Sequence, residues 1–411
     1  MKHVWILNHY AKVPGESGGT RHYHLAEGLK KHGWEATIIA ASLANSESNM
    51  YMENNEGSCC KIVDNISFLW LKVPSYTGNG VRRIFNMFTY TFRVLKKKTT
   101  SKIPQPDVII GSSVHPFAAM AGVILSRRYD VPFVFEVRDL WPQTLIDMGR
   151  LKNNSIVTKL LRMLEGWLYR NADYIVVLLP KAWEYIVPFG ISRSKIIWIP
   201  NGVDLSLFRE VTLPSESKNS EFTLMYFGAH GQANDLDNII YAMDIVNKCP
   251  YGKNIKLRLI GNGVLKPSLI ELSDKLALNN VVFEPAVPKK KVPTLAAQAD
   301  GFIISVLDLP GLYRYGISMN KLFDYLAAMR PIIIASAAVN NPVADAKAGL
   351  TVEPNNPQAL ANAILKLSKM PLCIRQKMAI SGRRYVELNH DFNLLAKKLS
   401  DTLDLAIQDR S

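Results

Sequence analysis

Short apolar, β-branched runs alternate with longer amphipathic stretches along the first 200 residues. The runs are HVWILNH (3–9), EATIIAAS (35–42), DVIIGSS (107–113), PFVFEVRD (132–139) and DYIVVLLP (173–180). Each predicts a strand, whereas TRHYHLAEGLKKHG (20–33) has helical spacing and ends at Gly33, which predicts a helix with a glycine C-cap. Strands that are apolar on both faces and separated by helices indicate a parallel sheet covered on both sides.

The alternation is interrupted once and then restarts. IIWIPNGVD (196–204) is followed by the polar stretch REVTLPSESKNSE (209–221), which reads as a linker or surface loop. Further strands are predicted at FTLMYFG (222–228), NIKLRLIGNG (254–263), VVFEP (281–285), GFIISVL (301–307) and PIIIAS (331–336). We therefore expect an α/β protein with two doubly wound, Rossmann-like domains, and a ligand beyond the carboxyl ends of the strands in the cleft that the domains share.

The predicted domains are residues 1–200 and 201–385, with an amphipathic helix within residues 386–411 that crosses back to the first domain. A chain of 411 residues is too long for one ordinary hydrophobic core. The composition, with 48% hydrophobic and 20% charged residues, argues against disorder. The four cysteines lack metal-ligand spacing, which favours a reducing, cytosolic setting. Only four apolar residues follow Met1-Lys2-His3, so no secretory signal is expected.

One charge-free stretch, residues 108–126, is long enough to cross a membrane. Ser112, Ser113, His115 and Pro116 lie at its centre, so a strand, a polar loop and a helix explain it better.

The net charge of +14 is unevenly distributed. Residues 1–200 carry 25 Lys/Arg against 15 Asp/Glu, whereas residues 201–411 carry 24 against 20. The first half is therefore expected to face something anionic: nucleic acid, a phosphorylated substrate or an acidic bilayer.

Six segments, in order and across nearly the whole chain, resemble the retaining glycosyltransferases of family 4, which have the GT-B architecture. They are GESGGTRHYHLAEGLKKHG, SSVHPF, FEVRDLWP, IPNGVD, LIGNGVLK and SMNKLFDYLAAMRP. The likeness is strongest to the WbuB-like subgroup of O-antigen and capsule assembly, proposed to move N-acetyl-fucosamine. The chain departs from the family where two glutamates are usual, because Gly316 and Asp324 stand there. It also lacks the usual Arg and Lys after the second domain's first strand, where His230 lies, which shifts charge onto Lys321.

A diphosphate site is predicted at the start of the helix in SMNKLFDYLAAMRP. Ser318 would be the N-cap, which places Asn320, Lys321 and Leu322 in the first turn. A cation is disfavoured at a helix N-terminus, and a bound diphosphate would relieve that misfit. The alternative is a surface lysine on an ordinary helix start.

The resemblance assigns Asp324 to the ribose hydroxyls, and the alternative is an i, i+3 ion pair with Lys321. Further expected donor-binding residues lie in glycine turns, where the backbone can approach a phosphate closely or, alternatively, simply turn tightly. They are Gly18 and Gly19 in GESGG, Gly228, and Gly261, Gly263 and Lys266 in GNGVLK.

Two further strand ends carry the predicted catalytic residues of the first domain. The resemblance suggests that His115 hydrogen-bonds the donor sugar; a structural loop histidine is the alternative. Arg138 could hold a diphosphate, of the donor or of a lipid-linked acceptor, and Asp139 could position or deprotonate the acceptor hydroxyl. A buried Arg–carboxylate cluster with Glu136, which braces the loop, is the other interpretation.

No metal and no cofactor are expected. DLD (235–237) imitates a metal-binding motif, but it lies at a predicted helix start, where acids complement the dipole. Positive groups such as Lys321 would stabilise the leaving diphosphate instead.

The stretch VRRIFNMFTYTFRVLKKKT (81–99) predicts one basic, amphipathic helix. Its apolar stripe is formed by residues 81, 84, 85, 88, 92 and 95. This pattern is typical of a helix at an anionic membrane surface, and a core-packed helix with a solvated basic face is the alternative. Nucleic acid is not expected, because no recognised binding motif accompanies the charge.

These observations predict a metal-independent transferase that moves a sugar from a nucleotide donor, UDP-linked, to a polyprenyl-diphosphate-linked glycan. The resemblance to family 4 implies that the transfer retains the anomeric configuration. The enzyme would be cytoplasmic and peripheral on the inner face of the membrane. A non-hydrolysing UDP-sugar epimerase has the same architecture and is one alternative. A catalytically silent membrane-surface protein is the other.

Overall fold

A computed structural model describes residues 1–15, 19–42, 52, 57–76, 80–113, 115–215 and 221–410. The chain forms two compact units, which are described separately below. Unit 1 comprises Met1–Pro200 and Phe392–Ser411, and unit 2 comprises Asn201–Asp391. The sequence had suggested a boundary between residues 200 and 201 and a return beginning at residue 386.

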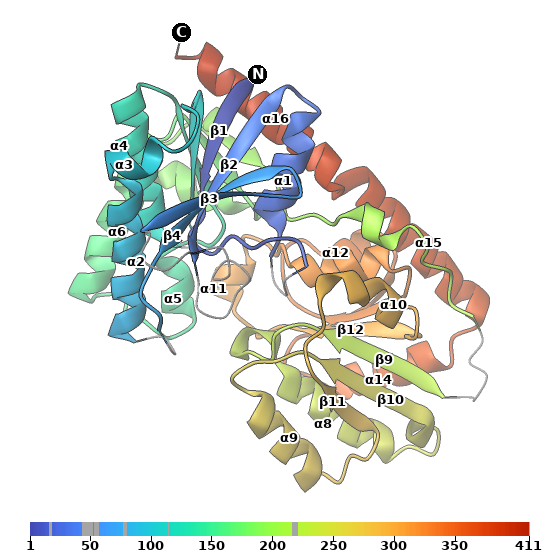
Figure 1. The fold of residues 1–411 in the computed structure, drawn as a ribbon. Coiled ribbons are helices and arrows are strands. Elements are labelled where there is room, and N and C mark those ends of the chain that lie inside the picture. Colours follow the sequence, from blue (N-terminus) through green and yellow to red (C-terminus); the bar gives the residue numbers. More distant parts are fainter. Residues whose placement is uncertain are drawn as a thin grey trace. The chain divides into compact units, whose positions relative to one another are not determined.

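Unit 1 is built on an eight-stranded sheet in the order β3-β4-β2-β1-β5-β6-β7-β8 (Figure 1). Its strands are β1 (Lys2–Leu7), β2 (Trp34–Ser42), β3 (Ser58–Val63), β4 (Ile66–Lys72), β5 (Val108–Ser112), β6 (Phe133–Val137), β7 (Tyr174–Val177) and β8 (Ile196–Trp198). All neighbours are parallel except the β3–β4 hairpin. The central strand is apolar on both faces because both are covered, and Val4, Trp5, Ile6 and Leu7 are fully buried.

Helices cover both faces of this sheet. The helices are α1 (Arg21–Lys30), α2 (Val81–Val94), α3 (Lys97–Thr100), α4 (Pro116–Tyr129), α5 (Gln143–Asp147), α6 (Ile156–Asn171), α7 (Ala182–Ile186) and α16 (Phe392–Gln408). On one face α4 packs between α2 and α6, and on the other α16 packs against α1 (Figure 1). The contact is close, since a Cβ on Gly28 would lie 2.4 Å from the Ala396 Cβ.

Unit 2 holds a six-stranded parallel sheet in the order β11-β10-β9-β12-β13-β14. The strands are β9 (Phe222–Phe227), β10 (Ile255–Ile260), β11 (Val281–Glu284), β12 (Gly301–Ser305), β13 (Ile332–Ala335) and β14 (Gly349–Val352). The helices are α8 (Leu236–Asn247), α9 (Lys266–Lys275), α10 (Val292–Ala296), α11 (Pro310–Tyr313), α12 (Asn320–Ala327), α13 (Pro342–Asp345), α14 (Pro357–Ser368) and α15 (Leu372–Asn389). Two apolar clusters, one on each face, form its core.

The order of both sheets identifies where ligands are expected. Strand succession reverses between β1 and β5 in unit 1 and between β9 and β12 in unit 2. The loops beyond the carboxyl ends of these strands leave a crevice in open α/β sheets. Each unit therefore has one such switch point.

The predicted alternation of strands and helices is confirmed, with two kinds of error. The β3–β4 hairpin, the three-residue β8 and the four-residue β14 were not predicted. Residues 81–99 form two helices instead of one, because α2 ends at Val94 and α3 begins at Lys97. The stretch 108–126 is β5, a loop and the start of α4, as expected. Among the described helices, none has the length and apolarity needed to span a bilayer.

Candidate functional site

Lys321 occupies the first turn of α12, next to the switch point of unit 2. Its Nζ donates to the Tyr226 hydroxyl at 2.8 Å and to Oδ1 of Asn234, and it lies 4.4 Å from the Tyr226 ring centroid. Burial lowers the pKa of Lys321 to about 7. A cation held by two neutral oxygens is poorly compensated, and an anion placed here would restore its charge.

The prediction that Ser318 caps this helix is wrong. The N-cap is Met319, whose side chain makes no capping hydrogen bond. Ser318 instead accepts a hydrogen bond from the backbone N–H of Asn201 at 2.8 Å, and its carbonyl accepts one from the Asn201 amide at 2.6 Å. Among the described residues, no side chain therefore occupies the N-cap acceptor position of α12. Asn320 and Lys321 do begin the helix, as predicted.

Three predicted glycines pack where a side chain would not fit. A Cβ on Gly228 would lie 2.9 Å from the Tyr226 hydroxyl and 3.4 Å from Cε of Lys321. A Cβ on Gly261 would lie 1.9 Å from the Gly228 carbonyl oxygen, and one on Gly263 would lie 2.2 Å from the His230 carbonyl oxygen. These glycines let the loops after β9 and β10 pack against each other beside Lys321.

The Gly261→Ala change is expected to lower the free energy of unfolding by about 3 kcal/mol or more, because its Cβ would collide with backbone. Gly231 is the matched control, because it lies on the same loop system and a Cβ there meets no atom within 4 Å. Gly231→Ala should change stability by less than about 0.5 kcal/mol. Denaturant unfolding of both variants measures this, and equal effects would contradict the packing described.

His230 is a residue that the sequence analysis noted but did not place in the site. It is fully buried, and neither ring nitrogen has a hydrogen-bond partner among the described residues. Burial, with the nearby charges of Lys266 and Lys321, lowers its pKa to about 4, so the ring is neutral at pH 7. An uncharged ring with unused hydrogen-bonding capacity beside two lysines is suited to contact a polar ligand.

Other predicted donor-binding residues already have partners within the protein. Lys266 donates to the carbonyl oxygens of Gly261 at 2.9 Å and Glu284 at 2.7 Å. Asp324 forms an ion pair with Lys289, not the predicted alternative pair with Lys321. The Leu322 side chain is fully buried in the core. Lys266 and Leu322 thus have structural roles in this conformation.

In unit 1, His115 begins α4 at the carboxyl end of β5. It is the helix N-cap, since its Nδ1 accepts from the Ala118 N–H at 3.3 Å, while its Nε2 has no hydrogen-bond partner among the described residues. The ring is fully buried and lies 4.8 Å from the ring of His9, which follows β1. Burial lowers the pKa of His9 to about 3 and that of His115 well below its ordinary value. Two neutral histidines therefore meet at the switch point, and the sequence analysis missed His9.

The expected Arg–carboxylate cluster exists, but the arginine is Arg21. Glu136 accepts from Nε of Arg21 at 2.9 Å and from the Ser112 hydroxyl at 2.7 Å, and it lies 2.6 Å from Nε2 of His22. The charges of His22 and Arg21 hold the pKa of Glu136 well below its ordinary value despite burial. Arg138 lies outside this hydrogen-bonded cluster, although its charge also lowers the pKa of Glu136.

Arg138 and Asp139 follow β6 and are the more accessible pair. No side-chain hydrogen bond or ion pair of Arg138 is found among the described residues, and its backbone N–H donates to the Ser113 hydroxyl at 3.0 Å. Asp139 is exposed. Both are thus free to meet a substrate, as the predicted roles require.

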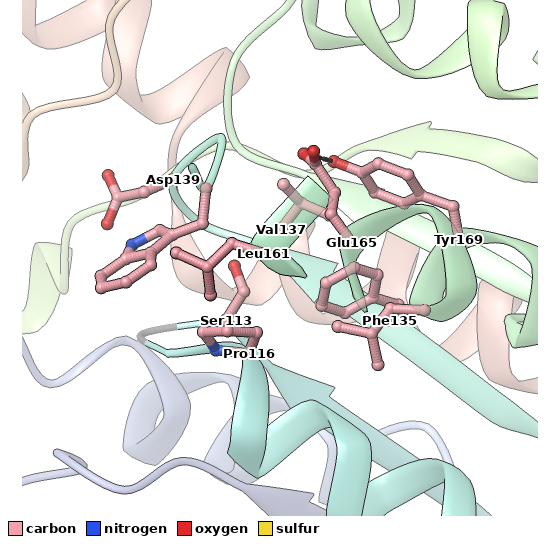
Figure 2. Close-up of a pocket in the computed structure, with 10 residues that line it drawn as sticks. Ser113, Pro116, Phe135, Val137, Asp139, Leu161, Glu165 and Tyr169 are labelled. Atoms are coloured by element: carbon pink, nitrogen blue, oxygen red, sulfur yellow. Dashed lines mark hydrogen bonds between the residues drawn. The ribbon is translucent and has the colours of Figure 1, made fainter. Parts of the chain in front are cut away.

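Beside Asp139 lies a small recess, lined also by Ser113, Val137, Glu165 and Tyr169 (Figure 2). Its volume of about 10 Å³ accommodates roughly one water molecule, which is far too small for a nucleotide. Tyr169 and Tyr185 each donate to Glu165 at 3.0 Å, and burial raises the pKa of Glu165 to about 8. The carboxylate of Asp139 points away from that pair (Figure 2).

The remaining predictions concern the first glycine turn and the acidic motif. Gly18 lies outside the described residues, and Gly15 has φ +105°, as a tight turn requires. Gly19 directly precedes Thr20, the N-cap of α1, and its predicted role stays a prediction. Asp235 is the N-cap of α8, so DLD does begin a helix, and the Ser305 hydroxyl donates to Asp235 at 2.8 Å. Within the described ranges, no cluster of three or more His, Cys, Asp or Glu side chains could hold a metal.

Each of the two units matches a known family model. Residues 18–202 match the model of the glycosyl transferase 4-like domain, and residues 221–370 match that of the glycosyl transferases group 1. The chain is a GT-B glycosyltransferase. The transferase is similar to the probable glycosyltransferase WbjE of Pseudomonas aeruginosa, with 24% identity over 309 residues that cover 72% of this chain and 73% of the relative.

Solved structures share the fold of the transferase at low sequence identity. Sucrose-phosphate synthase from Thermosynechococcus elongatus superposes with a TM-score of 0.75 at 16% identity, over 100% of both chains. Anabaena Alr3699/HepE in complex with UDP-glucose superposes with a TM-score of 0.66 at 16% identity, over 98% of this chain and 100% of that chain. These likenesses establish the architecture.

Proposed function

We propose that the transferase is a retaining, metal-independent enzyme of family 4, close to the WbuB-like subgroup. It moves a hexose-type sugar, for which N-acetyl-L-fucosamine is the candidate, from a UDP-sugar to a polyprenyl-diphosphate-linked glycan. The reaction belongs to bacterial surface polysaccharide assembly, O-antigen or capsule. The enzyme works as a peripheral protein on the cytoplasmic face of the inner membrane. Anomeric retention, the sugar and the acceptor come from the sequence resemblance.

The observation that carries this proposal is the environment of Lys321. When a nucleotide-sugar bond breaks, negative charge grows on the β-phosphate of the leaving nucleotide. The Lys321 ammonium and the uncapped start of α12 supply donors to that charge without a metal ion. The Anabaena protein of the same fold is solved with UDP-glucose, which supports UDP as the nucleotide.

In unit 1 the accessible pair after β6 serves the acceptor. We assign Asp139 to the acceptor hydroxyl and Arg138 to the diphosphate of the lipid-linked substrate. His115 and His9, neutral and buried, have nitrogen atoms suited to a sugar hydroxyl. Asp324 and the glycine loops of unit 2 belong to the donor.

A thermal-shift panel of UDP, GDP and ADP tests the proposal. UDP should raise the Tm of the full-length protein, because a ligand that binds only the folded state stabilises it. If none of the three nucleotides raises the Tm, the proposed use of a nucleotide-sugar donor is wrong. Product analysis with a UDP-sugar and lipid acceptor separates transfer from epimerisation and from a silent binding protein.

UDP binding should weaken as the pH rises above 7. In the free protein the pKa of Lys321 is about 7, so the side chain loses its proton as the pH rises above 7. A bound diphosphate raises that pKa, so UDP binding is coupled to protonation of Lys321. The affinity should fall by up to about tenfold per pH unit between pH 7 and pH 9. Isothermal titration at several pH values measures it. Lys321→Arg keeps its charge throughout, and a pH dependence that survives in this variant would contradict the assignment.

A further inference from the structure

We infer that helices α2 and α6 together form one docking face of unit 1 for an anionic lipid surface. The sequence predicted a membrane-binding helix only at residues 81–99. The structure adds a second helix with the same character, and it separates the buried side of α2 from its exposed side. The inference deepens the proposed function and rests on it in one respect: a lipid-linked acceptor would explain why the protein docks on a membrane. The evidence for the docking face itself comes from the exposure and charge of the two helices.

Helix α2 has two apolar sides with different roles. Met87, Tyr90 and Val94 are buried against unit 1 and hold the helix on the domain. Phe85 and Phe92, with 62% and 66% of their surface exposed, lie on the other side. The residues that pack on the core are therefore not those of the predicted apolar stripe. Most of the stripe stays exposed to solvent.

Helix α6 repeats this arrangement on the far side of α4. Its inner residues Leu168 and Tyr169 are buried, while Ile156, Leu160 and Met163 have 77%, 59% and 68% of their surface exposed. The exposed residues recur at intervals of three or four, which places them on one side of the helix. Helix α4 packs between α2 and α6, so the three helices form one continuous layer (Figure 1).

The charges on this layer identify its partner. The sequence has six Lys/Arg and no Asp or Glu over residues 81–98, and four Lys/Arg and no Asp or Glu over residues 148–164. Exposed apolar side chains beside basic residues suit acidic lipid headgroups over an apolar interior. A second copy of this chain fits less well, because a two-fold contact would place the same basic charges opposite one another.

The layer also lies at the end of unit 1 where a lipid-linked acceptor would have to arrive. Helices α4 and α6 run back from the carboxyl edge of the sheet, so Ile156 and His115 both lie towards that edge. Asp139, which follows β6, is at the same edge. The docking face and the proposed acceptor residues thus share one end of the domain.

The test is co-sedimentation of the full-length protein with vesicles of phosphatidylcholine, alone or mixed with phosphatidylglycerol. We expect binding only to the anionic vesicles and its loss in high salt. The double variant Leu160→Gln/Met163→Gln should bind roughly tenfold more weakly, because both side chains lose their burial in lipid. Phe85→Gln/Phe92→Gln should weaken binding by at least as much.

The matched control is Leu388→Gln/Ile380→Gln on α15 of unit 2, where the side chains are 64% and 49% exposed. It should bind vesicles as the wild type does. Failure of the wild type to bind anionic vesicles overturns the inference, and so does a loss confined to the α2 variant. If the wild type forms a stable dimer and Leu160→Gln/Met163→Gln is monomeric, the face serves self-association instead. Nucleotide binding, measured without vesicles, reports separately on the proposed function.

Discussion

Replacing Lys321 by methionine is expected to weaken UDP binding about 100-fold, or about 2.7 kcal/mol. The change removes the ammonium that lies at the start of α12 and donates to Tyr226 and Asn234. Isothermal titration measures the loss. The rate of transfer should fall further than the affinity, because charge on the leaving diphosphate is greatest in the transition state.

The stability of the same variant distinguishes a binding role from a structural one. Methionine fills a similar volume without a charge to desolvate, so the Tm of the nucleotide-free Lys321→Met protein should be unchanged or higher. A lysine that only braces the β9 loop would give the opposite pattern, with a lower Tm and little change in UDP affinity. Lys289 forms an ion pair with Asp324, so the Tm of Lys289→Met can be compared with that of Lys321→Met within the same unit.

Arg21→Met is expected to be the most destabilising of the substitutions considered, with a loss of roughly 3–5 kcal/mol in the free energy of unfolding. Arg21 is fully buried and neutralises Glu136, and its guanidinium also donates to the carbonyl oxygens of Ile199 and Pro200. Methionine would leave a buried carboxylate and two carbonyl groups without these donors. Denaturant unfolding measures the change.

The exposed pair Lys397–Asp401 provides the control for Arg21. Both side chains are more than half exposed, so Asp401→Ala should cost no more than about 0.5 kcal/mol. The loss in unfolding free energy caused by Arg21→Met should also be smaller when it is measured in a Glu136→Gln background, because the two residues share one interaction. Strict additivity of the two substitutions would show that the ion pair contributes little.

The fold was largely predictable because its strands are buried on both faces. Apolar runs such as residues 108–110 and 302–304 are hard to mistake. The glycine C-cap predicted at Gly33 was wrong, because α1 ends at Lys30 and its C-cap is Lys31. The β3–β4 hairpin escaped because β3 (SCCKIV) has no alternation of buried and exposed positions, with three consecutive exposed residues at 60–62. Its turn uses Asp64 and Asn65 at φ 44° and 68°. The β14 strand has only four residues, so its pattern is too short to read.

The positions of Lys321 at the start of α12 and of His115 after β5 were predictable, because each depends only on residues nearby in the sequence. The site was not predictable where partners come from distant parts of the chain. Arg21 finds Glu136 across 115 residues, and nothing near residue 138 indicates that another arginine fills this role. His9 carried a weaker signal, because a single polar ring directly after a buried strand is also common in structural positions.

The placement of α16 determines the order in which the chain can mature. Its residues Leu395, Leu399 and Leu403 complete the apolar cluster of unit 1, although they follow all of unit 2 in the sequence. On the ribosome, the half that is made first must therefore wait for residues 392–411 before its core is closed. A nascent chain released just short of Phe392 would carry an unfinished first half, with the α1 side of its sheet open to chaperones and proteases.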